Sequence, residues 1–281
     1  MIKKILSIAD YHREIQDEAI KEAYKSTCLI FNIINNNPKP NATGVFIRIE
    51  NFHFLISAAH VFENHTDENF IWNENEKFNR LGGELIMNSL PDGMNREKDK
   101  IDVAILRLDD ESIEIAKKKY KFLNDSEIEI NHKIIDAPLY TAVGFPKTYN
   151  EFSRYKNELQ IKPFIITTQP ASVEIYKVFE REISLNIIVI YDKNKVFNHK
   201  PNQQLTGPDP FGISGGGLWY VPPQKVESGS KIEKKLVGIL NKWPPKNRKY
   251  WIATKIDIYT EIIREKYNLK IEQSKQVKIE L

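Results

Sequence analysis

The hydrophobic residues of this chain fall mostly into short runs that are rich in β-branched and aromatic side chains. Asn, Gly and Pro separate these runs, a pattern typical of β-strands joined by hairpins and loops. We expect strands at residues 28–34, 45–49, 52–57, 103–108, 139–145, 161–167, 183–191, 236–241 and 251–256. Many short strands with few helices between them predict an all-β barrel or sandwich.

Apolar residues at helical spacing lie near the two ends of the chain. Ile15 and Ala19 share one face of a helix that we predict over residues 10–25. A second helix is predicted over residues 257–267. The polar, Lys-rich residues 268–281 predict a loosely held tail.

Composition and charge exclude several classes of protein. Hydrophobic residues make up 41% of the sequence, which is more than a disordered chain contains. No run approaches the roughly 20 apolar residues that a membrane span needs, so no contact with a membrane is expected. Lys and Arg outnumber Asp and Glu only by 41 to 38, and the charges are interleaved, so we predict no basic patch for nucleic acid.

The single cysteine, Cys28, cannot form an internal disulfide, so the fold is not a disulfide scaffold. The apolar stretch at the N-terminus stops at Asp10, short of the apolar core of a secretion signal. Both features favour a reducing compartment, and we expect a cytoplasmic protein. Cys28 lies in an apolar run, which places it in the core rather than at a reactive site.

Three short segments carry residues that suit catalysis. His60 follows the apolar run 52–57 and two alanines, and Asp102 directly precedes the run 103–108. Ser214 lies in a glycine-rich turn, Gly212-Ile213-Ser214-Gly215-Gly216, before another apolar run.

These residue types fit acyl transfer. A serine hydroxyl needs an adjacent base to become a nucleophile, and histidine titrates near the working pH. A carboxylate behind the histidine fixes its tautomer and stabilises the imidazolium that forms. Glycines let the backbone turn so that amides, here those of Gly212 and Ser214, can face a developing oxyanion.

The order of these residues along the chain discriminates between scaffolds. The glycine-rich turn also matches the G-x-S-x-G pattern of α/β-hydrolases, but that fold requires a histidine after the serine, and none of the six histidines follows Ser214. The subtilisin order needs an aspartate before His60, and Asp10 and Asp17 lie there in a charged, helical context. The order His60, Asp102, Ser214 is that of chymotrypsin-like enzymes.

Across residues 25–267 the chain resembles the trypsin-like (chymotrypsin-fold) serine peptidases, and it looks like a bacterial, stand-alone, cytoplasmic member. His60 lies in an Ala-Ala-His motif, Asp102 in an Asp-Val-Ala-Ile strand start and Ser214 in a Gly-x-Ser-Gly-Gly motif. The resemblance implies an all-β fold of two antiparallel six-stranded β-barrels with an N-terminal and a C-terminal helix. The expected parts are an N-terminal helical segment, a first barrel, a linker, a second barrel and a C-terminal helix with tail, at residues 1–24, 25–125, 126–138, 139–256 and 257–281.

The same resemblance implies a serine endopeptidase that cuts protein or peptide substrates through an acyl-enzyme and needs no cofactor and no metal. The residue before Ser214 is Ile213, where zymogen-activated members carry an aspartate that pairs with a newly cut N-terminus. We therefore expect activity without N-terminal cleavage, either as made or through a regulatory protein partner. Some bacterial members belong to defence or regulatory operons, although no residue here indicates such a role.

Three residues are candidates for substrate binding. Asp209, five residues before Ser214, could select Lys or Arg by charge, although we favour a turn residue within Gly207-Pro208-Asp209-Pro210. Asn241 and Trp243 follow residues 236–240, which the resemblance places beside the substrate backbone. Trp243 either walls the specificity pocket or closes a Pro-rich turn.

Two alternatives from other classes remain open. A catalytically silent peptidase fold would act as a binding module. An effector would stay inactive until a partner protein docks, and residues 10–25 are the candidate docking segment, although we expect them to pack on the second barrel instead.

Overall fold

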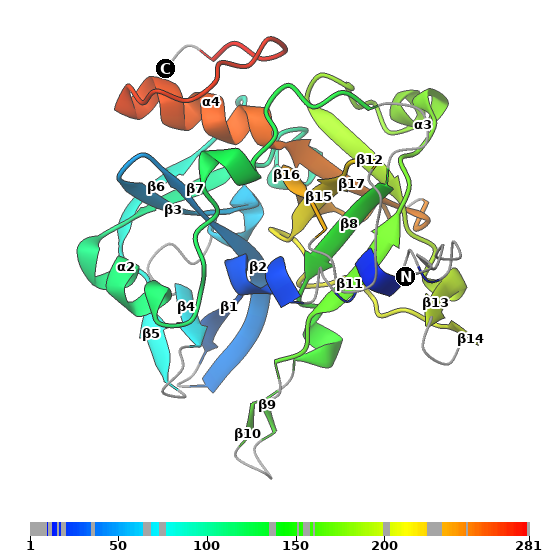
Figure 1. Ribbon diagram of the computed structural model, residues 1–281, viewed down its shortest axis with the longest axis horizontal. Helices are drawn as coiled ribbons and strands as arrows, with labels where there is room; N and C mark the ends of the chain where they lie inside the picture. Colours follow the sequence, from blue (N-terminus) through cyan, green and yellow to red (C-terminus); the bar gives the residue numbers. More distant parts are fainter. Residues whose placement is uncertain are drawn as a thin grey trace, which may run out of the picture.

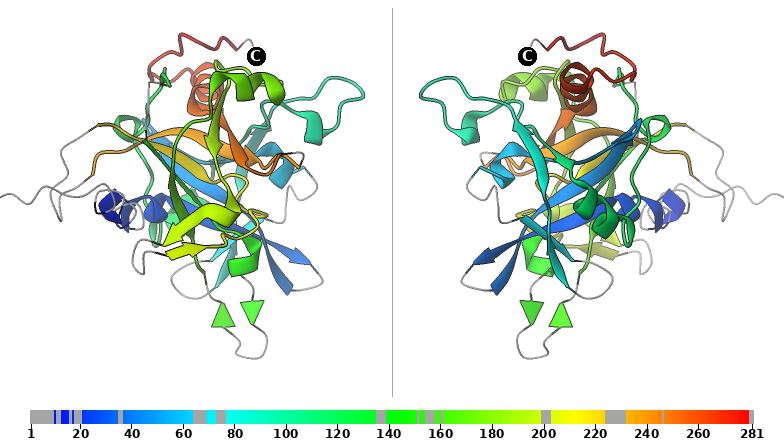
Figure 2. Two further views of the ribbon diagram at one scale, coloured as in Figure 1. Left: turned by 90° about the vertical axis from the view of Figure 1, so that its right-hand side faces the viewer. Right: turned by 90° about the vertical axis from the view of Figure 1, so that its left-hand side faces the viewer.

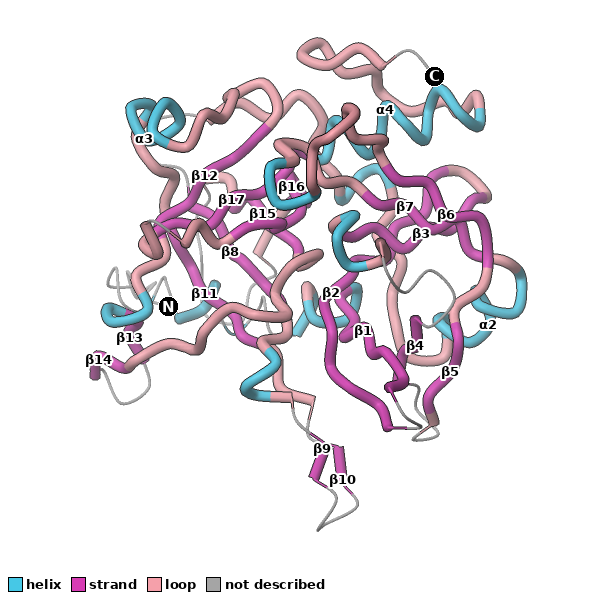
Figure 3. Tube along the Cα trace, turned by 180° about the vertical axis from the view of Figure 1, so that it is seen from behind, coloured by secondary structure: helices cyan, strands magenta, loops and turns pink. Residues whose placement is uncertain are grey.

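The computed structural model describes residues 10, 13–15, 17, 21–34, 37–63, 69–72, 77–134, 139–150, 152–153, 158–159, 161–198, 203–223, 232–245 and 247–279. The described chain is mostly β-structure, in two antiparallel sheets that lie side by side (Figures 1 and 3). A C-terminal helix, α4 (Ile256–Tyr267), packs across them. No helix in these ranges is long and apolar enough to cross a membrane.

The first sheet has seven strands in the order β5-β4-β1-β2-β3-β7-β6, one more than expected. Its edge strands β5 and β6 are separated in sequence only by Leu81 and Gly82, so the sheet curves until its two edges approach each other. The amide of Gly82 donates to Ser112 Oγ (2.8 Å) instead of to a neighbouring strand, which divides β5 from β6. The strands are β1 (Thr27–Ile34), β2 (Asn37–Ile49), β3 (Phe52–Ser57), β4 (Asn69–Trp72), β5 (Phe78–Arg80), β6 (Gly83–Met87) and β7 (Ala104–Leu108).

The second sheet has six strands in the order β11-β8-β15-β16-β17-β12. The chain just after β11 bonds to β12: Ala171 N donates to Ile188 O (2.8 Å) and Ile190 N donates to Gln169 O (3.0 Å). The second sheet therefore closes on itself. The strands are β8 (Leu139–Gly144), β11 (Phe164–Thr168), β12 (Asn186–Ile190), β15 (Gly217–Val221), β16 (Lys235–Lys242) and β17 (Tyr250–Lys255).

Two small hairpins extend from the second half of the chain. One is β9 (Phe152–Ser153) with β10 (Glu158–Leu159), which projects from the body of the molecule (Figure 1). The other is β13 (Val196–Asn198) with β14 (Gln203–Leu205). Neither hairpin was expected, because both lie in polar stretches of the sequence.

Alternation along the strands divides the apolar residues between separate cores. In the first sheet, Phe46 and Leu55 face a cluster inside the curved sheet, where Cys28 is fully buried as expected. Their neighbours Val45 and Ile56 face the opposite way, into a core that both sheets share with α4. Because strands alternate the direction of their side chains, a strand buried on both faces reads as a continuous apolar run.

Two short helices were not expected from the sequence, α2 (Asp110–Lys117) and α3 (Val173–Val178). The N-terminus of α2 is capped by Asp109, whose carboxylate accepts from Ser112 N (2.8 Å). The remaining helical segments are 3₁₀ turns: η1 (Tyr24–Ser26), η2 (Ala59–Val61), η3 (Arg96–Lys98), η4 (Asp125–Glu127), η5 (Lys147–Tyr149) and η6 (Lys193–Lys195).

Part of the predicted N-terminal helix lies outside the described residues. Residues 10, 13–15, 17 and 21–22 are helical. Ile15 is buried against Val221, at the end of β15, and against Ile232. This contact agrees with packing on the second sheet.

The prediction of a loose C-terminal tail is wrong for residues 268–279, which run back along α4 (Figure 1) and lie beside the helix when it is viewed end-on (Figure 2). Ser274 is buried; its hydroxyl donates to Asp257 Oδ1 (2.9 Å), and its amide donates to Glu261 Oε1 (2.5 Å). Leu269 is buried as well. The polar residues of this segment form hydrogen bonds with buried polar side chains of α4. Such contacts between distant residues are not visible in a local sequence pattern.

Candidate active site

His60 lies in a turn directly after β3. The turn η2 begins at Ala59, and its first bonds run from Val61 N to Ala58 O (3.2 Å) and from Phe62 N to Ala59 O (3.0 Å). Ala58 and Ala59 are fully buried, and their small side chains let the turn pack closely against the first sheet. The imidazole of His60 is 38% exposed, so it can meet a ligand from solvent.

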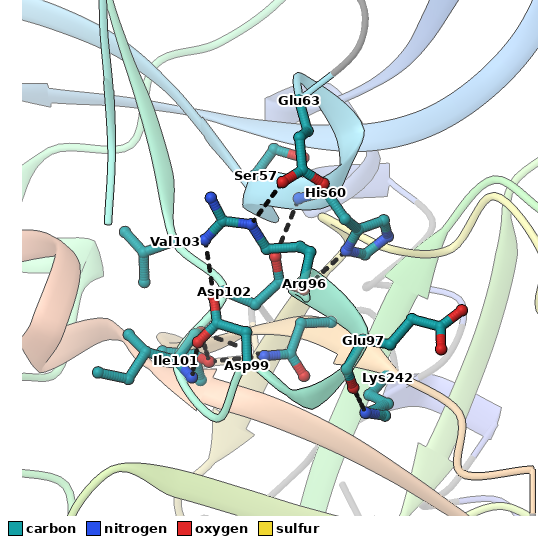
Figure 4. A network of polar contacts seen from close by, with 12 residues as sticks. Ser57, His60, Glu63, Arg96, Glu97, Asp99, Ile101, Asp102, Val103 and Lys242 are labelled. Atoms are coloured by element: carbon teal, nitrogen blue, oxygen red, sulfur yellow. Dashed lines mark hydrogen bonds and ion pairs between the residues drawn. The ribbon is translucent and has the colours of Figure 1, made fainter. Parts of the chain in front are cut away.

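Asp102 lies just before β7, beside this turn. Because β3 and β7 are antiparallel neighbours with Ser57 opposite Ala104, the end of β3 and the start of β7 meet. The carboxylate of Asp102 accepts from His60 N (2.9 Å), and its second oxygen is 2.7 Å from His60 Nδ1 (Figure 4). The carboxylate is 7% exposed, so this side of the pair is shielded from water.

Ser214 lies in the glycine-rich turn before β15. Gly212 and Gly215 have backbone φ angles of 95° and 87°, a region that favours glycine. A methyl group on Gly215 would lie 1.8 Å from Thr43 O, so no larger residue fits there. The turn is fastened to β16, because Gly215 N donates to Leu240 O (2.7 Å).

Two amides of this turn have no acceptor among the described residues. Ile213 N donates to Pro210 O (3.0 Å) and Gly216 N donates to Ile213 O (2.7 Å), whereas the amides of Gly212 and Ser214 make no such bond. Two unpaired donors next to a hydroxyl form a site that can stabilise an oxyanion.

Thr43 in β2 joins this turn to the first sheet, and sequence reasoning missed it. Its amide donates to Ser214 O (2.8 Å), and its hydroxyl donates to Gly212 O (2.8 Å) and accepts from Phe145 N (2.9 Å). The residue is fully buried. In the sequence, a polar residue between two small ones, Ala42 and Gly44, is the local signal for this role.

His60, Asp102 and Ser214 line one cavity of about 760 Å³ between the two sheets. The described contacts include no hydrogen bond between Ser214 Oγ and His60 Nε2. Such bonds are often long before substrate binds. No group of three or more His, Cys, Asp or Glu side chains in the described ranges is arranged to hold a metal ion.

The three candidates for substrate binding have different surroundings. Asp209 is not among the lining residues of this cavity, and its carboxylate forms an ion pair with Lys193 Nζ (2.7 Å). Asn241 lines the cavity but is nearly buried, and its amide donates to Thr254 Oγ1 (2.8 Å). Trp243 lines the cavity, and its ring is edge-on to that of Phe211 (centroids 6.0 Å apart).

Two lysines at the cavity have altered acidity. Burial lowers the pKa of Lys242, and the nearby charge of Arg181 lowers it further. Burial also lowers the pKa of Lys147, whose side chain packs beside Gly212. Neither ammonium group has a carboxylate within ion-pair distance among the described residues.

Comparisons with known proteins support the fold. No protein-family model matches the sequence, and no curated protein matches it either. Among solved structures, the chain is similar to neuropsin, a serine protease expressed in the limbic system of mouse brain, with a TM-score of 0.54 and 14% sequence identity. The superposition covers 86% of this chain and 94% of neuropsin, so the chain has a chymotrypsin-like fold.

Proposed function

We propose that this protein is a serine endopeptidase that hydrolyses peptide bonds through an acyl-enzyme. One observation carries the proposal: a His60–Asp102 pair and Ser214, beside two unpaired amides, line the same cavity. The chymotrypsin-like fold supports it, because serine peptidases use this scaffold.

In the proposed reaction, Ser214 Oγ attacks the substrate carbonyl while His60 Nε2 accepts its proton. Asp102 holds the Nδ1–H tautomer and stabilises the imidazolium. The amides of Gly212 and Ser214 bind the oxyanion, His60 then protonates the leaving amine, and water hydrolyses the acyl-enzyme.

Packing supports activity without N-terminal cleavage. Ile213 is buried in the core of the second sheet, in the same cluster as Leu218 and Leu240, and its side chain packs against Gly144. We propose that this apolar contact holds the turn of Ser214 in shape where other members of the fold use an ion pair. A cytoplasmic location and a regulatory partner stay predictions.

A fluorophosphonate probe tests the proposal directly. The intact chain should be labelled on Ser214, and Ser214→Ala or His60→Ala should abolish labelling and lower turnover of a denatured proteome by several orders of magnitude. Ser89→Ala, in an exposed loop, is the matched control and should leave labelling and turnover unchanged. Full labelling of Ser214→Ala would exclude the assigned nucleophile.

A silent binding module is the second candidate, because the hydrogen bonds of the described residues include none between Ser214 and His60. It predicts no labelling of the intact chain, together with binding of peptides that is equal in Ser214→Ala and the wild type. The same probe experiment therefore separates the two functions.

A further inference from the structure

Asp102 has an uncommon backbone conformation. Its φ is 52°, in the left-handed region that residues other than glycine seldom adopt. Such a conformation persists only where the surroundings enforce it. The hydrogen bonds of the two flanking residues, Ile101 and Val103, supply that constraint.

Each flanking amide donates to a side chain rather than to a strand. Ile101 N donates to Asp99 Oδ1 (2.9 Å), and Val103 N donates to Asn88 Oδ1 (2.8 Å). The two acceptors are bonded to each other, because Asn88 Nδ2 donates to Asp99 Oδ2 (3.0 Å). Asp99 and Asn88 therefore form one bracket that holds the chain on both sides of Asp102. Figure 4 shows Asp99 beside Ile101 and Asp102.

Arg96 donates hydrogen bonds to both residues of this bracket. Its Nη1 donates to Asp99 Oδ2 (2.8 Å) and to Asn88 O (3.0 Å), and its Nε is 3.5 Å from Glu63 Oε1, in the turn that carries His60. Burial raises the pKa of Asp99, but the bonds from Asn88, from the amide of Ile101 and from Arg96 outweigh burial and hold the pKa below its ordinary value. The carboxylate is thus ionised and able to accept at neutral pH.

Residues of β16, of β17 and of the segment between α3 and β12 donate hydrogen bonds to backbone carbonyl groups of the same loop. Both terminal nitrogens of Arg181 donate to Asp99 O (3.3 Å each), and Asn241 Nδ2 donates to Ile101 O (3.3 Å). Thr254 Oγ1 also donates to Ile101 O. The loop that carries Asp102 is therefore fixed relative to the sheet that carries Ser214.

We propose that Asp99 and Asn88 are positioning residues that set the orientation of Asp102 toward His60. The inference deepens the proposed peptidase function and rests on it for its kinetic consequences. Neither side chain touches His60 in the described contacts, so each acts through the backbone of Asp102.

The variants Asp99→Ala and Asn88→Ala test this role. Each should lower kcat by about 10²-fold with little change in KM, because a small displacement of an aligned group is costly in the transition state. Asp99→Asn keeps an acceptor for the amide of Ile101 and should recover most of the loss. Asn88 is partly exposed, so Asn88→Ala keeps the test informative if Asp99→Ala does not fold.

A readout independent of turnover is the tautomer of His60, measured by ¹⁵N NMR of the imidazole. The wild type should hold the Nδ1–H tautomer, and Asp99→Ala should give a mixture of both. Ser274→Ala, which breaks a buried polar cluster at α4, is the control for general destabilisation and should keep the wild-type tautomer.

Two outcomes would overturn the proposal: wild-type kcat and tautomer in both alanine variants, or an Asp99→Asn variant no better than Asp99→Ala. Failure of the peptidase function is seen separately, as a wild type that fluorophosphonate does not label. The tautomer measurement still decides the positioning role in that case.

Discussion

The carboxylate of Asp102 holds His60 at two points, the backbone amide at 2.9 Å and the ring Nδ1 at 2.7 Å. The first bond fixes the turn η2 and the second fixes the ring. The aspartate therefore orients both the main chain and the side chain of the candidate base.

Asp102→Asn should separate these two tasks. The amide retains one acceptor oxygen for His60 N, but its NH₂ group cannot accept from Nδ1–H and favours the other tautomer. We expect a fall in kcat of about 10⁴-fold, the size this substitution has in trypsin-type triads, with little loss of stability. Single-turnover acylation and thermal unfolding measure the two effects. An active Asp102→Asn variant would contradict the role of the carboxylate.

The closeness of His60 and Asp102 could be predicted from the sequence. The contacts of Thr43 with the turn of Ser214 could not. His60 ends one apolar run and Asp102 begins another, so antiparallel pairing of the two runs is enough to bring them together. The contacts of Thr43 with Gly212 and Ser214 depend on how the two sheets pack. No local periodicity encodes a contact of that kind.

Thr43→Val should weaken the turn of Ser214. Valine matches the shape of threonine, but it leaves Gly212 O and Phe145 N without their buried partner, at a cost of about 1–3 kcal/mol for each group. Urea unfolding should show lower stability, and acylation by the fluorophosphonate probe should slow. Thr260→Val in α4, which removes a hydroxyl bonded only within its own helix, is the matched control and should not slow acylation. Equal acylation rates in both variants would refute the role of the Thr43 hydroxyl in supporting the turn of Ser214.

Substrate selectivity should depend on Trp243 and not on Asp209. The charge of Asp209 is paired with Lys193, and neither residue lines the cavity, so Asp209→Asn should leave the cleavage-site profile unchanged. Trp243→Ala removes a ring from the wall, and kcat/KM should shift toward larger side chains by about tenfold. Profiling both variants on a denatured proteome measures this. A preference for Lys or Arg that Asp209→Asn abolishes would contradict the prediction.

Two strands of the first sheet that sequence reasoning missed, β5 and β6, have a weak hydrophobic pattern. β6 has no fully buried residue and its apolar residues are confined to Leu85-Ile86-Met87, and β5 is only three residues long, so neither strand was distinct in the sequence. Asn88 and Asp99 lie in the polar loop after β6. The sequence pattern of such a loop indicates only that its side chains are exposed to solvent. Their partners are the amides of Ile101 and Val103, and such side chain to backbone bonds are visible only once the loop has folded.

Acid should destabilise the protein partly through Asp99. Burial raises the pKa of this carboxyl, but the bonds from Asn88, Ile101 and Arg96 hold the pKa in the folded chain below its ordinary value of 3.8. The unfolded chain therefore binds a proton at this carboxyl at a higher pH than the folded chain does. The stability that ionised Asp99 contributes above its ordinary pKa is lost as the pH falls through its lower, folded-state pKa.

Asp99→Asn cannot titrate at this position, so its free energy of unfolding should fall less steeply than that of the wild type between about pH 5 and pH 3. Urea denaturation at a series of pH values measures both slopes. Asp92→Asn, in an exposed turn, is the control for loss of a carboxylate and should keep the wild-type slope. Equal slopes for Asp99→Asn and the wild type would show that the bracket around Asp102 does not depend on an ionised Asp99.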